Sequence, residues 1–208
     1  QISDCRLPIA DCRWPMADCR LPMADGRWPI ADFRLQISDF RFQMLLISTP
    51  RFSEHCPPPG HPERMERGGV LEAVAAGFLA RGGEVRAPRM ATREELARVH
   101  VPEYLDRLEG LAGKAAMLDD DTFTSPETFE VARLAAGAAI EAARHAWTTG
   151  EAAMALVRPP GHHAEPHKAM GFCFYSNIAL AAAALRADGV ERVAIVDFDV
   201  HHGNGTQA

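Results

Sequence analysis

The chain has 208 residues, of which 47% are hydrophobic and 24% are charged, the balance of an ordinary soluble globular protein. Its formal net charge of −6 argues against direct binding of nucleic acid, which calls for a basic surface. No apolar run approaches the roughly 20 residues of a membrane span, and the N-terminus lacks the pattern of a signal peptide. The five cysteines include no Cys-x-x-Cys pair, so a reducing cytoplasm is the simplest setting.

Residues 1–43 form a tandem repeat of seven residues, whose first unit runs from Ser3 to Ile9. Prolines at positions 8, 15, 22 and 29 exclude a coiled coil, since each removes a helix donor. A unit of seven is also too short for a solenoid. We expect a disordered segment, or repetitive DNA translated upstream of a true start at Met44, and a folded domain at residues 44–208.

Four helices are predicted by apolar periodicity and capping signals. The first covers residues 63–80, with Val70, Leu71, Val74 and Phe78 as its inner stripe. A Thr92–Glu95 capping box opens a short helix through Val99. Ser125 is expected to cap a helix from Pro126 to Thr149, with Val131, Leu134 and Ala138 inward and Gly150 at its end. The fourth covers Asn177 to Ala187.

Short apolar runs between these helices predict strands at residues 44–48, 84–87, 154–157 and 193–196. Strands that alternate with helices form parallel βαβ units, so the fold class is α/β with three layers and a mainly parallel sheet. In such sheets, ligands bind at the carboxyl ends of the strands.

Several polar residues between these elements have two interpretations. His55 and His61 lie in a proline-rich loop and are expected at a rim or in hydrogen bonds rather than on a metal ion. His100 and Tyr104 are expected to pack and to form hydrogen bonds. The acidic run Asp119–Asp121 is expected to be a solvated turn, and a carboxylate at a pocket rim is the alternative.

The run Val193–Val196 leads into Asp197, Asp199 and His201, which the alternation of a strand places on one face. Carboxylate and imidazole are both zinc ligands, so Asp199 and His201 make a candidate ligand pair. A solvated strand end is the alternative for such a pair in isolation. Charge at the end of a buried strand is costly unless it is paired, which favours the metal interpretation.

A second histidine-rich turn follows the strand at 154–157, where His162 and His163 come after a rigid Pro159-Pro160. Histidine titrates near neutral pH, so tandem imidazoles suit proton transfer, although a surface pair without a role is the alternative. Together with the metal pair, they indicate a metal-assisted amide hydrolase in which a histidine deprotonates water.

Three blocks, Arg158–Ala164, Gly171–Phe174 and Asp197–Gly205, resemble in sequence and order the signatures of the zinc-dependent histone deacetylase family. They are most similar to its class II and bacterial amidohydrolase branch, which includes acetylpolyamine amidohydrolases. The resemblance runs from about Met44 to Ala208 and covers only the N-terminal part of the family's catalytic domain. It implies an arginase/deacetylase-like fold that stops after the metal-bearing strand.

The resemblance implies roles for the residues around the metal. Asp199 and His201 match two of three zinc ligands. His163 matches the general base and His162 its electrostatic partner. Asp197 matches the carboxylate behind His162, which also helps to bind a monovalent cation, usually potassium.

Four further residues match positions around the substrate. Asn204 stands where a side chain orients the other histidine. Gly171 and Phe172 match the walls of a narrow acyl-lysine tunnel. Arg67 resembles an arginine near an internal cavity at the foot of that tunnel.

The third zinc ligand of the family and the tyrosine that polarises the carbonyl lie downstream of these blocks and cannot be assigned in this chain. We therefore expect an incomplete site. A sheet that ends after the metal-bearing strand would expose an edge and apolar helix faces, so we also expect low solubility or partial unfolding.

The leading hypothesis is a zinc-dependent hydrolase that releases acetate from acetyl-lysine in proteins or from an acetylpolyamine. One alternative is a non-catalytic fragment that binds an acyl-lysine, and another is an arginase-like hydrolase with two manganese ions. Neither nucleic acid nor a membrane is an expected partner, and a homo-oligomer remains open.

Overall fold

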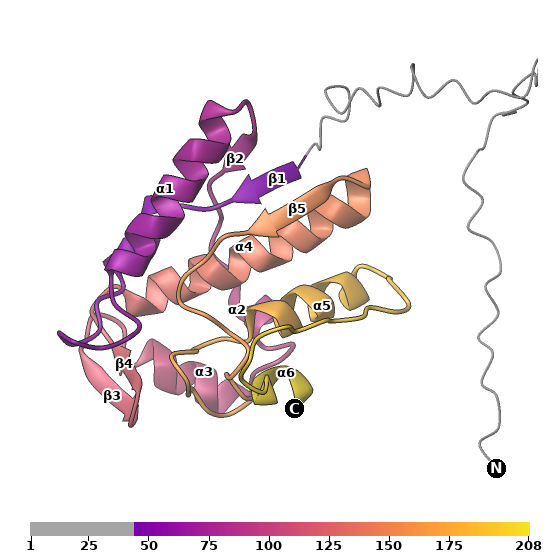
Figure 1. Cartoon of the computed structure of the whole chain (residues 1–208). Helices are drawn as coiled ribbons and strands as arrows, with labels where there is room; N and C mark the ends of the chain where they lie inside the picture. Colours follow the sequence, from indigo (N-terminus) through magenta and orange to yellow (C-terminus); the bar gives the residue numbers. More distant parts are fainter. Residues whose placement is uncertain (1–43) are drawn as a thin grey trace, which may run out of the picture. The chain divides into compact units, whose positions relative to one another are not determined.

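The computed structural model describes residues 44–208 (Figure 1). The seven-residue repeat lies outside the described residues, so both its predicted disorder and the boundary at residue 43 stay predictions. Between residues 44 and 208, no helix is long and apolar enough to cross a membrane.

A three-stranded parallel sheet carries the fold, with β1 (Met44–Ile47) between β2 (Glu84–Arg86) and β5 (Ala152–Ala155). Leu45 of β1 pairs with Glu84 on one side and with Ala153 on the other. Leu45, Leu46 and Ile47 are all buried, so both faces of the central strand are covered. The predicted α/β class with a parallel sheet is confirmed.

Two alanine-rich helices, α4 (Thr128–Thr149) and α5 (Asn177–Ala187), form the layer below the sheet in Figure 1. Ala138 and Ala142 of α4 pack against Leu45 and Ile47 of β1. Ile140 of the same helix belongs to a second cluster with α5. Small side chains allow these close approaches of α4 to the sheet and to α5.

The remaining elements surround this core. They are η2 (Pro50–Glu54), α1 (Glu66–Ala80), α2 (Arg93–Leu96), α3 (Pro102–Glu109), β3 (Ala116–Asp119), β4 (Thr122–Thr124) and α6 (Asn204–Gln207). β3 and β4 form an antiparallel hairpin, in which Met117 pairs with Phe123. The Thr92–Glu95 capping box is confirmed, because each residue's side chain accepts from the other's backbone N–H.

Gly150 ends α4 in the left-handed conformation, with φ 75°, as the sequence predicts. The predicted inward positions Val131, Leu134 and Ala138 are buried. The start of that helix was predicted too early. Thr128 is the first helical residue, because the Thr128 hydroxyl accepts from Ser125 N–H at 2.7 Å and closes a separate turn.

Other boundaries shift by a few residues: α1 begins at Glu66, α2 ends at Leu96, and β5 starts two residues before the predicted strand. The predicted inner stripe of α1 is wrong at Val70 and Val74, which are 62% and 48% exposed. The apolar residues of α1 are spread around the whole helix, so their periodicity did not identify a single buried face. Leu71 does pack on the Phe52 cluster.

The strand predicted at residues 193–196 is also wrong, because this segment pairs with no strand between residues 44 and 208. An open groove of about 820 Å³ separates it from β5. Val196 and Phe198 are 85% and 97% exposed. Without a neighbouring strand to donate and accept hydrogen bonds, the apolar run forms no ladder.

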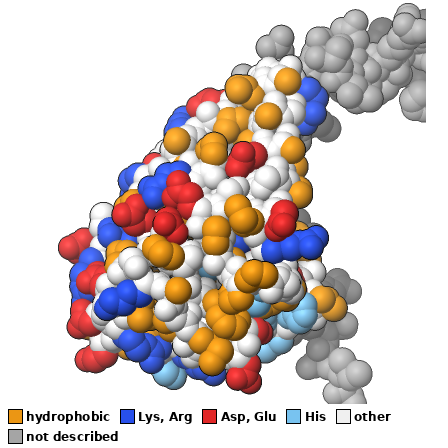
Figure 2. All heavy atoms as spheres, turned by 90° about the vertical axis from the view of Figure 1, so that its left-hand side faces the viewer, with side chains coloured by type: hydrophobic (Ala, Val, Ile, Leu, Met, Phe, Trp, Pro, Cys, Tyr) orange, Lys and Arg blue, Asp and Glu red, His pale blue; other side chains and the backbone are white. Residues whose placement is uncertain are grey.

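Charged side chains of both signs are interspersed with apolar ones on the face shown in Figure 2. Ion pairs such as Arg51–Glu130 at 2.8 Å and Arg86–Glu84 at 2.7 Å link neighbouring charges. Exposed pairs of this kind contribute little to stability individually.

Candidate active site

The loop after β5 carries the tandem histidines, and a buried ion pair holds its start. Arg158 is 2% exposed and Glu63 is 1% exposed. The Arg158 guanidinium donates to both Glu63 carboxylate oxygens, from Nε at 2.7 Å and from Nη2 at 2.5 Å. Nη1 of Arg158 also donates to the Phe52 carbonyl at 2.7 Å. Four residues beyond this anchor, the chain reaches His162.

A tight turn places the two imidazoles side by side. Ala164 N–H donates to the Gly161 carbonyl at 3.0 Å, so His162 and His163 occupy the two central positions of the turn. Their ring centroids are 4.0 Å apart. A Cβ at Gly161 would lie 2.6 Å from the backbone nitrogen of Asn177, so only glycine lets this turn lie against the start of α5.

The C-terminal segment is tied to the same turn. The N–H groups of Gly205 and Thr206 donate to the His162 carbonyl at 2.9 and 3.2 Å. A Cβ at Gly203 would lie 2.6 Å from the Asp197 carboxylate, so that glycine leaves room for the acid. In this way His162 and Gly205, which are 43 positions apart, meet at one place.

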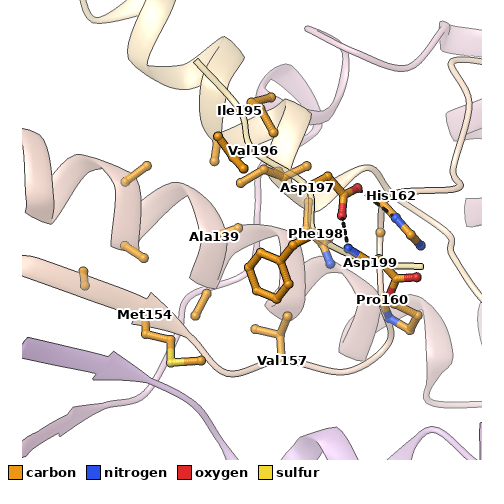
Figure 3. Close-up of a pocket in the computed structure, with 18 of the residues that line it drawn as sticks. Ala139, Met154, Val157, Pro160, His162, Ile195, Val196, Asp197, Phe198 and Asp199 are labelled. Carbon is orange, nitrogen blue, oxygen red and sulfur yellow. Dashed lines mark hydrogen bonds and ion pairs between the residues drawn. The ribbon is translucent and has the colours of Figure 1, made fainter. Parts of the chain in front are cut away.

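His162 pairs with Asp197, as the resemblance implies. The distance between His162 Nδ1 and Asp197 Oδ2 is 3.0 Å, and Figure 3 shows the contact at the rim of the groove. Asp197 Oδ1 accepts from Asp199 N–H at 3.1 Å. That backbone N–H, followed by His162, lowers the pKa of Asp197. The carboxylate therefore stays ionised and holds Nδ1–H of His162.

His163 pairs with Asn204, where Nδ1 lies 2.7 Å from Oδ1 of the amide. The Asn204 Nδ2 group donates to Glu165 Oε1 at 2.9 Å. On the other side of the ring, a Cβ at Gly171 would lie 2.5 Å from His163 Cδ2, and Gly171 has φ 56°. Backbone on one side and an amide on the other thus hold the imidazole.

The candidate metal ligands Asp199 and His201 lie together at the open end of the site. Asp199 Oδ1 is 2.9 Å from His201 Nδ1 and accepts the His201 N–H at 2.8 Å. The side chains are 48% and 72% exposed. The backbone N–H and the ring of His201 lower the pKa of Asp199, which keeps the carboxylate ionised.

This donor pair fits part of a zinc site. Two ligands at about 2.0–2.2 Å from one tetrahedral ion lie roughly 3.3 Å apart, which needs only a small opening of the Asp199–His201 contact. Among residues 44–208, no group of three or more His, Cys, Asp or Glu side chains is arranged to hold a metal ion. A catalytic zinc normally has three protein ligands, so these two form an incomplete set.

Aromatic side chains cluster around Phe172, which follows Gly171 in the chain. Phe172 has φ 68°, and its N–H donates to the Thr122 hydroxyl at 3.1 Å. The His61 ring lies edge-on to Phe172 and Phe123, at centroid distances of 5.0 and 5.2 Å. His61 also bonds the Asp121 carbonyl at 3.0 Å, which attaches the proline-rich loop to the β3–β4 turn.

Arg67 is exposed beside a cavity of about 360 Å³, whose lining also includes Glu63, Arg158 and Pro160. The cavity thus touches the buried ion pair rather than the histidine rings. Sequence reasoning missed Glu63 and Arg158, which are 95 positions apart and share no motif. It also missed Glu165, although an acid two residues after tandem histidines was a usable signal.

Two further histidines are buried in the scaffold of the site. His55 bonds the Thr128 hydroxyl at 2.7 Å, and His100 bonds the Glu165 carbonyl at 3.1 Å. Burial, assisted by Arg158, lowers the pKa of His55 to about 3. Burial lowers the pKa of His100 to about 4. Both rings are neutral at neutral pH, and the packing and hydrogen-bonding roles predicted for His100 and Tyr104 are confirmed.

Comparison with known proteins identifies the scaffold. Residues 59–208 match the model of the histone deacetylase domain. The histone deacetylase-like amidohydrolase of Pseudomonas aeruginosa is 48% identical over 155 residues, which cover 72% of this chain and 40% of that protein. The human polyamine deacetylase HDAC10 is 40% identical over 162 residues, covering 70% of this chain and 23% of that protein.

The fold agrees with the sequence match. The crystal structure of the HDA15 HD domain superimposes with a TM-score of 0.73 at 36% identity, over 79% of this chain and 49% of that one. The chain spans less than half the length of each of these three proteins. The family resemblance and the deacetylase-like fold inferred from the three motif blocks are confirmed. The chain belongs to the histone deacetylase family.

Proposed function

We propose that the protein is part of a zinc-dependent deacetylase that hydrolyses the acetyl-amide of acetyl-lysine or of an acetylpolyamine, releasing acetate and a free amine. The observation that carries the proposal is the hydrogen bond between His163 Nδ1 and Asn204 Oδ1 at 2.7 Å. An oxygen acceptor at that position requires the proton on Nδ1, which leaves Nε2 of His163 as a free base.

Asp199 and His201 would hold the zinc ion, with a third ligand from outside the described residues. When bound, zinc polarises the amide carbonyl and makes a water molecule more acidic. The ring centroids of His163 and His201 are 6.0 Å apart, so the base lies within one water molecule's reach of the metal pair. His163 would take the proton of the attacking water and later pass it to the leaving amine.

His162 would act by charge rather than by proton transfer. Its Nδ1–H points to the ionised Asp197, which stabilises a positive imidazolium next to the reacting carbonyl. The ring centroids of His162 and His163 are 4.0 Å apart, so a charge on His162 would lie close to the base. We propose in addition, from the family resemblance, that Asp197 takes part in binding a potassium ion.

The aromatic wall supports a substrate with a narrow aliphatic stem. Phe172 is held by Thr122 and packs edge-on with His61, so a methylene chain would slide along a rigid apolar surface. Both an acetyl-lysine side chain and an acetylated polyamine present such a stem. The relatives carry both substrate classes in their names, as a histone deacetylase-like amidohydrolase and a polyamine deacetylase.

The test is acetate release from an acetyl-lysine peptide and from N-acetylputrescine, measured with one equivalent of zinc on this chain together with the segment that supplies the third ligand. We expect His163→Ala to abolish release, and the matched variant His167→Ala, at an exposed histidine outside the site, to keep it. No release by the parent chain from either substrate would reject catalysis in favour of the non-catalytic fragment. Two tightly bound manganese ions per chain would support the arginase-like alternative.

A further inference from the structure

The amide of Asn204 has two chemically different ends, and its surroundings assign them. Three groups surround Nδ2: Glu165 Oε1 at 2.9 Å, the His163 carbonyl at 3.4 Å and Met170 Sδ at 3.4 Å. All three only accept hydrogen bonds, so this end must be the NH₂ group. The opposite orientation would place the amide oxygen against a carboxylate.

The orientation of this amide determines which nitrogen of His163 carries the proton. With Oδ1 facing the ring, Nδ1 must donate, and Nε2 keeps its lone pair. If the amide turned over, its NH₂ group would donate to Nδ1 and the proton would move to Nε2. An asparagine can make either contact, whereas a carboxylate could only accept. Something outside the pair must therefore select the orientation, and Glu165 supplies the one charged acceptor.

Glu165 is itself firmly held. Its carbonyl accepts from His100 Nδ1 at 3.1 Å, and its N–H donates to the Lys168 carbonyl at 2.9 Å. His100 Nε2 accepts from the Ser176 N–H at 3.1 Å, so its proton is on the nitrogen that faces Glu165. The next residue, Pro166, accepts from Val101 N–H at 2.9 Å. A buried histidine and the start of α3 thus fix the backbone from which the carboxylate projects.

We propose that Glu165 is a positioning residue: its carboxylate holds the Asn204 amide in the orientation that places the proton of His163 on Nδ1. The role matters for catalysis only if His163 is the base, so to that extent it rests on the proposed function. It is an additional link in the site, because the motif residues alone leave both amide orientations available. Glu165 touches no reacting atom and acts only through Asn204.

The test reads the tautomer directly, without substrate. Long-range ¹H–¹⁵N spectra of the whole chain labelled at histidine distinguish Nδ1–H from Nε2–H rings, and His163→Ala assigns the signal. We expect Glu165→Met, which keeps the length and replaces the charged acceptor with a weakly accepting sulfur, to lower the Nδ1–H to Nε2–H ratio of His163 roughly tenfold or more. Glu165→Gln keeps an acceptor and should stay close to the parent. Glu103→Met, at an exposed glutamate on α3, is the matched control.

A double variant separates positioning from loss of packing. In Glu165→Met/Asn204→Asp, the aspartate can only accept, so Nδ1–H should be restored without Glu165. An unchanged ratio in folded Glu165→Met would overturn the proposal, and so would a double variant that leaves the ratio low. Should Glu165→Met not fold, Glu165→Ala with the same suppressor decides by the same criterion.

The outcome is independent of whether the chain turns over substrate. A changed tautomer in a chain that releases no acetate would support the role of Glu165 and reject the proposed function. Acetate release with an unchanged tautomer would do the reverse. Where both hold, Glu165→Met should lower kcat with little effect on KM, because the variant leaves the substrate wall intact.

Discussion

Removing the charge of Glu63 should destabilise the whole domain. In Glu63→Gln the side chain keeps its shape, but Arg158, which is 2% exposed, loses the carboxylate that it contacts at 2.7 and 2.5 Å. A buried charge left without its partner costs about 3–5 kcal/mol. At about 2–4 °C per kcal/mol for a protein of this size, the melting temperature should fall by roughly 6–20 °C. That loss is a large share of a typical stability of about 5–15 kcal/mol.

Urea unfolding of four chains would measure the coupling. Arg158→Met and Glu63→Gln should each be costly, but the double variant removes both charges and should cost about 2 kcal/mol less than their sum. The exposed pair Arg51–Glu54, whose atoms are 2.9 Å apart, is the matched control, and Glu54→Gln should cost under about 1 kcal/mol. If the two single losses in the free energy of unfolding add up in the double variant, the buried ion pair has no coupling. A Glu63→Gln loss as small as that of Glu54→Gln would likewise refute the claim that burial makes this pair costly to break.

Three further predictions follow from the scaffold of the site. Burial lowers the pKa of His100 from 6.5 to about 4, so the unfolded chain binds this proton more readily than the folded chain. The contribution of neutral His100 to the free energy of unfolding is therefore complete above pH 6.5, and roughly 3 kcal/mol of it is lost as the pH falls from 6.5 to about 4. As the pH is lowered across this range, the melting temperature should fall less steeply for His100→Gln than for the parent. Gly171→Ala should abolish acetate release, because its Cβ would lie 2.5 Å from the His163 ring. Gly150 has a similarly positive φ but free space around it, so the control Gly150→Ala should lose only about 1 kcal/mol of stability. Phe198→Ser should reduce aggregation and the binding of a dye for apolar surfaces more than Met117→Ser does. Phe198 is 97% exposed beside an apolar groove, whereas Met117 is a 66% exposed residue on β3.

Three residue pairs at the site could be predicted from the sequence motifs. His162 with Asp197, His163 with Asn204, and Asp199 with His201 were all predicted from position within the family blocks, and each pair is in contact. Their roles in catalysis remain proposals. Arg67 lies beside the cavity lined by Arg158, and its predicted place at the foot of a substrate tunnel stays a prediction.

The errors have one physical origin. The run Val193–Val196 has the composition of a buried strand, but a strand needs a neighbour, and β5 lies across a groove. Val70 and Val74 have helical spacing, yet burial depends on what packs against α1. Helix α5 and the capping box at Thr92 were predicted correctly, because caps and glycine ends depend on neighbouring residues.

The sequence by itself determined the features that depend on local chemistry and on short motifs. These are the alternation of helices and strands, the left-handed end of α4 at Gly150, the family and the residue pairs around His162 and His163. Only the tertiary structure decided which charges are buried and which acceptors meet which donors. Two such contacts join Arg158 with Glu63, which are 95 positions apart, and Glu165 with Asn204, which are 39 positions apart. A local sequence pattern does not specify a partner at such a distance along the chain.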